Sequence, residues 1–181
     1  MRLELRKRLI DEFRWVDPDP GSTHLISDVS GWWRDPDLLA ALGPALAAAH
    51  RATRPTVVVA PEVTGLLLGP LAAVALGVGF VPAHKHRDGR TVAGPTTWAR
   101  TPPDHRGRTL SLGVRDGRLG PGDRVLLVDD WVETGAQLTA LYEAIRRRGA
   151  EPVGASAVVA GCPPELARSL NLTWLLHADD L

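Results

Sequence analysis

The chain has 181 residues, of which 44% are hydrophobic, and this length and composition suit one globular domain with a sizeable core. Lys and Arg together number 21, as do Asp and Glu, so the formal net charge is zero. This balance argues against a broad basic surface for nucleic acid or membranes, and any phosphate chemistry must come from a local site. The single cysteine, Cys162, excludes an internal disulfide and favours a reducing compartment.

The N-terminus and the apolar stretches carry no targeting or membrane signal. The first ten residues, MRLELRKRLI, are charged throughout and lack the apolar region of a secretion signal. The longest apolar stretch, 66–78, is interrupted by Gly69, Pro70 and Gly77 and is too short to span a bilayer. We therefore expect a cytoplasmic protein without a membrane or nucleic-acid partner.

The N-terminal part is expected to hold two helices separated by turns. Residues 2–13 alternate charged side chains with Leu and Ile at helical spacing, which predicts a short helix. Segment 15–33 is rich in Pro, Gly, Asp and Ser, which is typical of turns. Asp35 and Pro36 are the residue types of a helix N-cap and first turn, and the Ala and Leu spacing predicts a helix over 37–52.

The next segment has the order strand, helix, strand. Residues 56–61, TVVVAP, form the continuous β-branched run of a strand that is buried on both faces. After a short loop, 66–77 predicts a mostly apolar helix and 78–85 a second strand. Such a βαβ unit implies a parallel sheet with a right-handed crossover.

A long polar segment follows. Residues 87–107 are rich in Gly, Pro, Thr and Arg, which predicts a long mobile loop of the kind that often covers an active site. Hydrophobic residues alternate over 108–115, which predicts another strand.

The C-terminal part continues the alternation of strands and helices. Residues 124–130 predict a central strand, and 136–150 an amphipathic helix that ends at Gly149 after three arginines, as the helix dipole favours. Residues 152–160 and 173–178 predict the final strands. Together these elements indicate an α/β fold.

Two adjacent acids, Asp129 and Asp130, end the predicted central strand. In open parallel sheets, ligands bind beyond the carboxyl ends of the strands. Two carboxylates there could accept hydrogen bonds from sugar hydroxyls, hold a magnesium ion, or both. The alternative is a solvated strand end that caps the next helix, since Asp is common at turns.

The loop after these acids leads into a helix N-terminus. The backbone N–H groups there and the Thr134 hydroxyl form a small anion pocket. Acids that bind a diol, next to a phosphate cradle, describe a site for a ribose 5-phosphate.

These residues resemble a known family. Segment 125–137, VLLVDDWVETGAQ, resembles the phosphoribosyl pyrophosphate (PRPP) motif of type I phosphoribosyltransferases: an apolar strand, two acids, two hydrophobic residues and a Thr-Gly loop. Segment 56–85 is similar to the part of adenine phosphoribosyltransferases that holds the pyrophosphate loop and its following helix and strand. Segment 17–39 resembles the N-terminal region of the same enzymes, so the likeness covers most of the chain.

The resemblance implies the type I phosphoribosyltransferase fold. This is a central parallel sheet of about five strands flanked by helices, in a single domain over 1–181. A small hood would come from about 1–36 and 161–181, and a flexible flap from about 87–107.

The resemblance also assigns site residues. Asp129 and Asp130 would contact the ribose hydroxyls and are the candidate ligands, direct or through water, of a Mg²⁺ cofactor. The PRPP 5-phosphate would bind the loop formed by Glu133, Thr134, Gly135, Ala136 and Gln137. The pyrophosphate would bind Glu62, Val63, Thr64, Gly65 and Lys85.

Three acids are the candidate catalytic residues: Asp129, Asp130 and Glu133. In 6-oxopurine phosphoribosyltransferases, an acid at the position of Glu133 lies near the base nitrogen that forms the new bond. Glu133 would thus act as a general base, or alternatively only cap its loop.

The acceptor pocket is the least specified part of the site. Candidate hood residues are His24, Leu25, Ile26, Trp32 and Trp33, with Trp131 nearer the sugar. The alternative is that most tryptophans are core or dimer contacts. The basic residues on or beside the flap, left without individual roles, are His84, Arg87, Arg90, Arg100, Arg106 and Arg108.

The resemblance implies transfer of a 5-phosphoribosyl group from PRPP to a nitrogen of a purine-like base, with release of pyrophosphate, as in purine salvage. It also implies a homodimer. Thr64, Ala136 and Gln137 depart from the family pattern and leave two alternatives open. One is a protein that senses PRPP or a nucleotide without catalysis, and the other is phosphoribosyl transfer or hydrolysis on a non-purine molecule.

Overall fold

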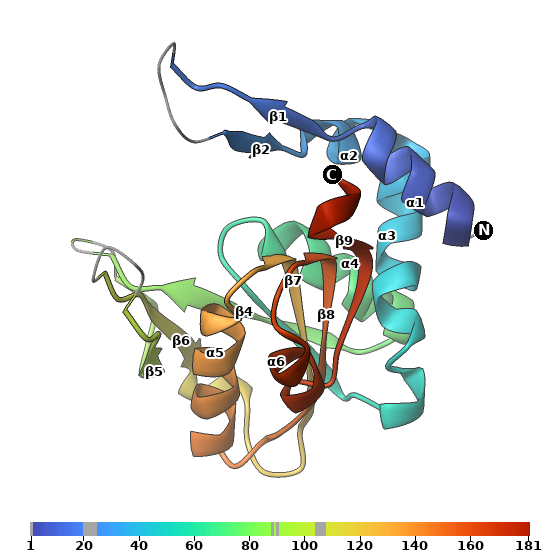
Figure 1. Cartoon of the computed structure of the whole chain (residues 1–181). Helices are drawn as coiled ribbons and strands as arrows, with labels where there is room; N and C mark the ends of the chain where they lie inside the picture. The colour runs from blue at the N-terminus through green and yellow to red at the C-terminus, as the bar shows by residue number, and fades with distance from the viewer. Residues whose placement is uncertain (1, 20–24, 88, 90, 104–107) are drawn as a thin grey trace.

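A computed structural model of the chain describes residues 2–19, 25–87, 89, 91–103 and 108–181. Within these residues, seven strands form one sheet in the order β5-β6-β4-β3-β7-β8-β9, with helices on both faces (Figure 1). The strands of this sheet are β3 (Val57–Pro61), β4 (Gly79–Lys85), β5 (Thr96–Arg100), β6 (Ser111–Arg115), β7 (Arg124–Val132), β8 (Glu151–Ala160) and β9 (Leu172–His177).

The centre of the sheet is parallel. Strands β4, β3, β7, β8 and β9 run in one direction, which confirms the expected parallel core of about five strands. Helix α4 (Gly65–Leu76) joins β3 to its parallel neighbour β4, as the βαβ pattern predicted. Strands β5 and β6 extend the sheet at one edge with antiparallel pairing.

Side chains of the central strands alternate between two apolar layers. Val57 and Val59 pack on the side covered by α5 (Ala136–Arg147) and α6 (Pro164–Ser169). Val58 and Ala60 pack on the side covered by α4 and the N-terminal helices α1 (Arg2–Asp11) and α3 (Pro36–Ala48). Burial on both faces explains the continuous apolar run of these strands.

The start of α3 follows its sequence signal. The Asp35 side chain accepts hydrogen bonds from the backbone N–H groups of Asp37 and Leu38, and Pro36 is the first helical residue. The helix ends at Ala48, before the predicted end at residue 52, and the chain continues into a 3₁₀ turn, η1 (Arg51–Thr53). The remaining short helices are α2 (Ser30–Arg34), η2 (Asp116–Arg118) and η3 (Ala178–Asp180).

Two segments that were expected to be turns or loops contain strands. In the N-terminal segment, β1 (Arg14–Val16) and β2 (Ile26–Asp28) form an antiparallel hairpin that projects above the sheet (Figure 1). The prediction of an unstructured loop over 87–107 is wrong for β5, because these residues pair with β6. The paired residues lie 11 to 19 positions apart in the chain, so the polar composition of 87–107 does not reveal the strand. No helix in the described part of the chain has the length and apolar character needed to cross a membrane.

Candidate active site

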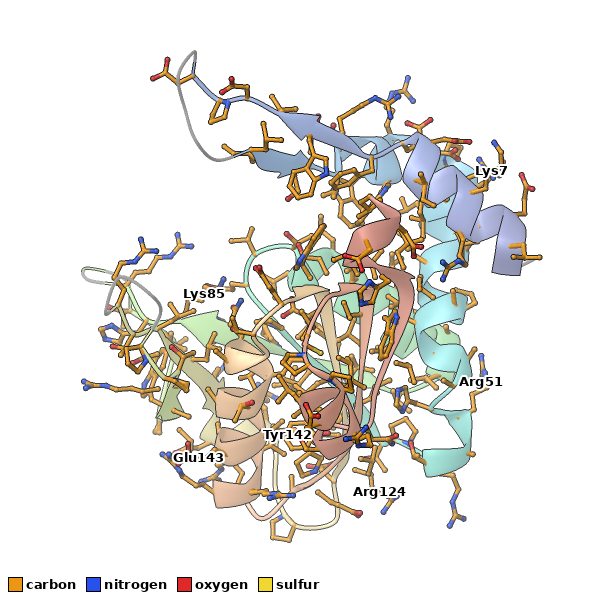
Figure 2. The ribbon with its side chains drawn as sticks, in the orientation of Figure 1. Lys7, Arg51, Lys85, Arg124, Tyr142 and Glu143 are labelled. Atoms are coloured by element: carbon orange, nitrogen blue, oxygen red, sulfur yellow. The ribbon has the colours of Figure 1, made fainter. Side chains whose placement is uncertain are left out.

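The candidate residues come from three neighbouring strands. Because β3, β4 and β7 are parallel, their carboxyl ends lie at the same edge of the sheet. Glu62 follows β3, Lys85 is the last residue of β4, and Asp129 and Asp130 lie near the end of β7. Figure 2 shows Lys85 on β4 near the N-terminal end of α5, which is the end that follows the acidic strand.

The acid pair combines a buried and a half-buried carboxyl. Asp129 is only 4% exposed, and its Oδ1 atom accepts a hydrogen bond of 3.0 Å from the backbone N–H of Asp130. Burial, followed by repulsion from the Asp130 carboxylate, holds the pKa of Asp129 well above its ordinary value, whereas Lys85 acts in the opposite direction. A cation bound beside both carboxylates would relieve the repulsion between them.

Mg²⁺ fits this donor set. It prefers oxygen ligands and usually keeps several waters, so one or two carboxylates and the substrate's phosphates suffice to hold it. Within the described residues, no group of three or more His, Cys, Asp or Glu side chains could hold a metal by itself. Asp129 and Asp130 are thus suited to a metal that arrives with a phosphorylated substrate.

The turn after β7 depends on a glycine. Gly135 has a φ of +66°, which favours glycine, and a Cβ atom there would lie 2.3 Å from Cδ2 of Leu166 in α6. The backbone N–H of Ala136, the first residue of α5, is 3.3 Å from the Thr134 hydroxyl oxygen. The turn thus presents the amino end of a helix at the carboxyl edge of the sheet.

A pocket of about 180 Å³ lies at this turn. Its lining residues are Asp129, Trp131, Val132, Glu133, Thr134, Gly135, Ala136, Gln137 and Leu138. The structure therefore brings Asp129 and the whole predicted 5-phosphate loop around one pocket. The Gln137 Oε1 atom is buried without a hydrogen-bond partner among the described residues, so its amide group is available to a ligand in either orientation.

The predicted pyrophosphate loop is organised by a buried carboxylate. Glu62 is 4% exposed; its Oε1 atom lies 3.0 Å from Nδ1 of His84, and its Oε2 atom accepts a 3.1 Å hydrogen bond from the backbone N–H of Lys85. The peptide bond between Glu62 and Val63 is cis. Since Glu62 is engaged with the end of β4, its position suits holding the loop and Lys85 in place.

The remaining loop residues lie between this carboxylate and α4. Val63 is 65% exposed, Thr64 is half-buried and Gly65 is buried. A Cβ atom on Gly65 would be 3.1 Å from side-chain atoms of both Ala60 and Pro61, which explains the need for a small residue here. The helix therefore begins directly against the end of β3.

The tryptophans of the hood have different environments. Trp32 is fully buried and its indole N–H donates to the Leu9 carbonyl oxygen at 2.9 Å, which agrees with the alternative that this tryptophan is a core residue. Trp33 packs edge-on against Trp32. Leu25 and Ile26 lie exposed at the hairpin, while His24 lies outside the described residues.

An aromatic cluster that the sequence reasoning missed lies next to the acids. Trp131 has its ring centroid 5.9 Å from that of Trp15 and 6.1 Å from that of Phe13. The Trp15 indole N–H also donates to the Leu181 carbonyl oxygen, at 3.1 Å. These contacts attach the hairpin to the site and to the C-terminal residue. Tryptophan content alone gave no indication of which residues would meet.

The described basic residues on or beside the flap have different environments. His84 is paired with Glu62, and Arg108 has interactions of its own. Arg87 and Arg100 are exposed, and Arg90 and Arg106 lie outside the described residues.

Comparisons with known proteins match this architecture. The family described as phosphoribosyl transferase domain matches residues 35–168. Adenine phosphoribosyltransferase of Streptomyces coelicolor is 35% identical over 142 residues, which cover 78% of this chain and 74% of the relative. The enzyme of the same name from Desulfitobacterium hafniense is 32% identical over 152 residues, which cover 84% and 82%.

The fold points to the same class. The crystal structure of adenine phosphoribosyltransferase from Rhodothermus marinus superposes with a TM-score of 0.82 at 25% identity, and the match covers 97% of this chain and 99% of that one. The chain thus has the fold of an enzyme that transfers phosphoribosyl groups. It belongs to the phosphoribosyltransferase family.

Proposed function

We propose that the chain transfers the 5-phosphoribosyl group of PRPP to a nitrogen of a purine-like base and releases pyrophosphate. The observation that carries this proposal is the pocket that joins Asp129 to the glycine turn at the amino end of α5. The two relatives described above, which are 35% and 32% identical to the chain, are named adenine phosphoribosyltransferases, so adenine is the first acceptor to test.

In this proposal the acids bind the sugar and the turn binds its 5-phosphate. Asp129 and Asp130 would accept hydrogen bonds from the ribose hydroxyls and ligate Mg²⁺, directly or through water. Bound Mg²⁺ would supply positive charge to the pyrophosphate leaving group. The backbone N–H groups from Thr134 to Gln137, and the Thr134 hydroxyl, would bind the 5-phosphate, because the N-terminus of α5 favours an anion.

The loop after β3 would bind the leaving group. Its backbone from Val63 to Gly65 and the Lys85 ammonium would contact the pyrophosphate, with Glu62 as the residue that positions them. Displacement at the anomeric carbon develops negative charge on the pyrophosphate, which these groups stabilise.

Glu133 is the candidate general base for the acceptor. Its side chain is exposed on the rim of the pocket, two residues beyond Trp131. A carboxylate there would take the proton from the base nitrogen as the new C–N bond forms. Trp131 and Trp15 would offer planar apolar surface to the base.

We further propose that the protein is a cytoplasmic homodimer. Helix α4 supports the dimer, because its outer face exposes Leu67 and Val74 by 51% and 81%, and the adjoining Val63 is also exposed. Apolar side chains in a row on a helix are typical of a surface that another protein covers. A second copy of this chain would then pack beside the pyrophosphate loop.

The test of the reaction is a panel of acceptors. The protein is incubated with PRPP, Mg²⁺ and, separately, adenine, guanine, hypoxanthine, xanthine and no base, and pyrophosphate and nucleotide are quantified. The proposal expects the two products in equal amounts with at least one purine. Binding of PRPP without any release would support a sensor instead, and release that does not depend on a base would support hydrolysis.

A further inference from the structure

We propose that the chain has a second anion-binding site, which takes a small organic phosphate monoester and lies between β4, β6 and residues 91–93. A cavity of about 460 Å³ opens there. Its lining includes Phe80, Pro82, His84, Val92, Arg115 and Arg118. It shares no residue with the pocket at the acidic strand end.

The cavity lies on the face of the sheet opposite α5. On β6, Leu112 and Val114 belong to the α5-side core, so the neighbouring Arg115 points to the other face. On β4, Ala83 belongs to the same core, which directs His84 to the face of Arg115. One arginine and one histidine from neighbouring strands thus lie on the same face of the sheet, and both line the cavity.

Neither Arg115 nor Arg118 has an ion pair with an acid anywhere in the described part of the chain. The acid between them in sequence, Asp116, is engaged elsewhere: it accepts a 2.6 Å hydrogen bond from the Thr97 hydroxyl and lies 3.8 Å from Arg148. Two guanidinium groups are therefore left to face the cavity. Guanidinium forks match phosphate geometry and hold the full charge at neutral pH, so a phosphate dianion is the ligand they suit.

The rest of the wall is apolar and selects an organic group. Phe80, Pro82 and Val92 line the cavity beside the arginines, and Phe80 also packs against Gly69 of α4. The volume lies within the range of about 300–1,000 Å³ that is usual for small-molecule sites. A compact aromatic or aliphatic phosphate monoester suits this cavity, because its phosphate can bind the arginines and its organic group can pack against the apolar residues.

One residue of the cavity also reaches the candidate active site. His84 hydrogen-bonds Glu62 at 3.0 Å, and the same carboxylate accepts the Lys85 N–H. An anion in the cavity that hydrogen-bonds to His84 would therefore compete with Glu62 for this ring and change how Glu62 holds the pyrophosphate loop. A phosphate monoester bound in the cavity is therefore expected to alter the KM for PRPP. This effect on KM rests on the proposed function, whereas binding of the monoester to the cavity is independent of it.

Phenyl phosphate is the probe, measured by isothermal titration calorimetry with the full chain. The test variant is Arg115→Gln/Arg118→Gln, and the control is Arg34→Gln/Arg168→Gln, which removes the same charge from exposed positions. Thermal unfolding checks that both fold. We expect the control to bind one more molecule of phenyl phosphate per chain than the test variant. If both variants still bind the same number, the affinity of one site should be at least about 100-fold lower in the test variant. This difference holds whether or not the strand-end pocket also takes the probe.

Equal stoichiometry and affinity in the two variants would overturn the site. Inorganic phosphate that binds there as tightly as phenyl phosphate would overturn the assignment to an organic monoester. For the coupling, phenyl phosphate should shift the PRPP KM by a different factor in the control and in the test variant. If the factor were the same in both variants, the coupling would be refuted, even if the test variant had lost binding of phenyl phosphate to the cavity.

Discussion

The Nδ1 atom of His84 lies 3.0 Å from the Oε1 atom of Glu62, across the carboxyl ends of neighbouring parallel strands. The other oxygen of Glu62 accepts the backbone N–H of Lys85, so one buried carboxylate connects the loop after β3 to the end of β4. This connection explains why an acid stands in a loop that is proposed to bind an anion. Glu62 orients the His84 ring and the Lys85 N–H, and both of its carboxylate oxygens have hydrogen-bond partners.

Replacement of Glu62 by Ala is expected to impair binding of PRPP more than turnover. The change leaves the Lys85 N–H and the His84 ring without their acceptor, and each lost hydrogen bond to a charged group is worth about 1.5–3 kcal/mol. The KM for PRPP should rise about 10- to 100-fold in steady-state assays of pyrophosphate release. Glu62→Gln keeps an acceptor oxygen and should lose less. A fall in melting temperature with an unchanged KM would show a purely structural role.

Gly135→Ala is expected to destabilise the turn that begins α5. The new Cβ would meet Leu166 at 2.3 Å, and the φ of +66° disfavours any residue with a Cβ. Overpacking and strain together should lower the free energy of unfolding by about 1–3 kcal/mol, measured by urea titration, and weaken 5-phosphate binding. The matched control is Gly117→Ala, where nothing lies within 4 Å of the added atom. Equal stability of the two variants would contradict this account of the turn.

Glu133→Gln is expected to separate chemistry from binding. The amide keeps the size of the side chain but cannot accept a proton at neutral pH, so kcat should fall about 100-fold or more while the dissociation constant for PRPP changes little. Both quantities are measured on the same preparation, by initial rates and by calorimetry. Equal losses in kcat and in PRPP affinity would remove the general-base role and leave Glu133 as a loop cap.

A buried histidine outside the candidate site is expected to make the free energy of unfolding depend on pH. His50 is 1% exposed, its Nε2 atom lies 2.9 Å from the Ala155 carbonyl oxygen, and its Nδ1 atom is buried without a partner among the described residues. Burial lowers the pKa of His50 from its ordinary value of 6.5, while the bond to Ala155 acts the other way. The unfolded chain therefore binds a proton more readily than the folded one.

The free energy of unfolding should thus be unaffected by His50 above pH 6.5 and fall as the pH drops below it, by at most about 1.4 kcal/mol per pH unit. Urea titrations from pH 5 to 8 measure this slope. His50→Gln should flatten it, whereas His86→Gln, a change at an exposed histidine, should leave it as in the wild type. A slope that His50→Gln does not reduce would refute the assignment.

Local patterns in the sequence were sufficient to predict the strands and the turn that hold the candidate site. The buried runs of β3 and β7, the acid pair and the Thr-Gly turn each have a short-range signal, so their common edge followed from parallel topology. The contact of Trp15 with Trp131, in contrast, joins residues far apart in the chain and depends on how the hairpin docks. Strand β5 depends on its pairing with β6, and the exposure of Arg115 and Arg118 to the cavity depends on how several elements pack, and neither follows from a local residue pattern.

The acid pair itself is the most direct point of test. PRPP with Mg²⁺ is titrated into the wild type, into Asp129→Asn/Asp130→Asn, and into Asp19→Asn/Asp179→Asn, which makes the same charge change at exposed positions. The account predicts that the wild type and the exposed variant bind alike, and that loss of both carboxylates weakens binding at least about 100-fold. PRPP that binds the Asp129→Asn/Asp130→Asn protein as tightly as the wild type would contradict it.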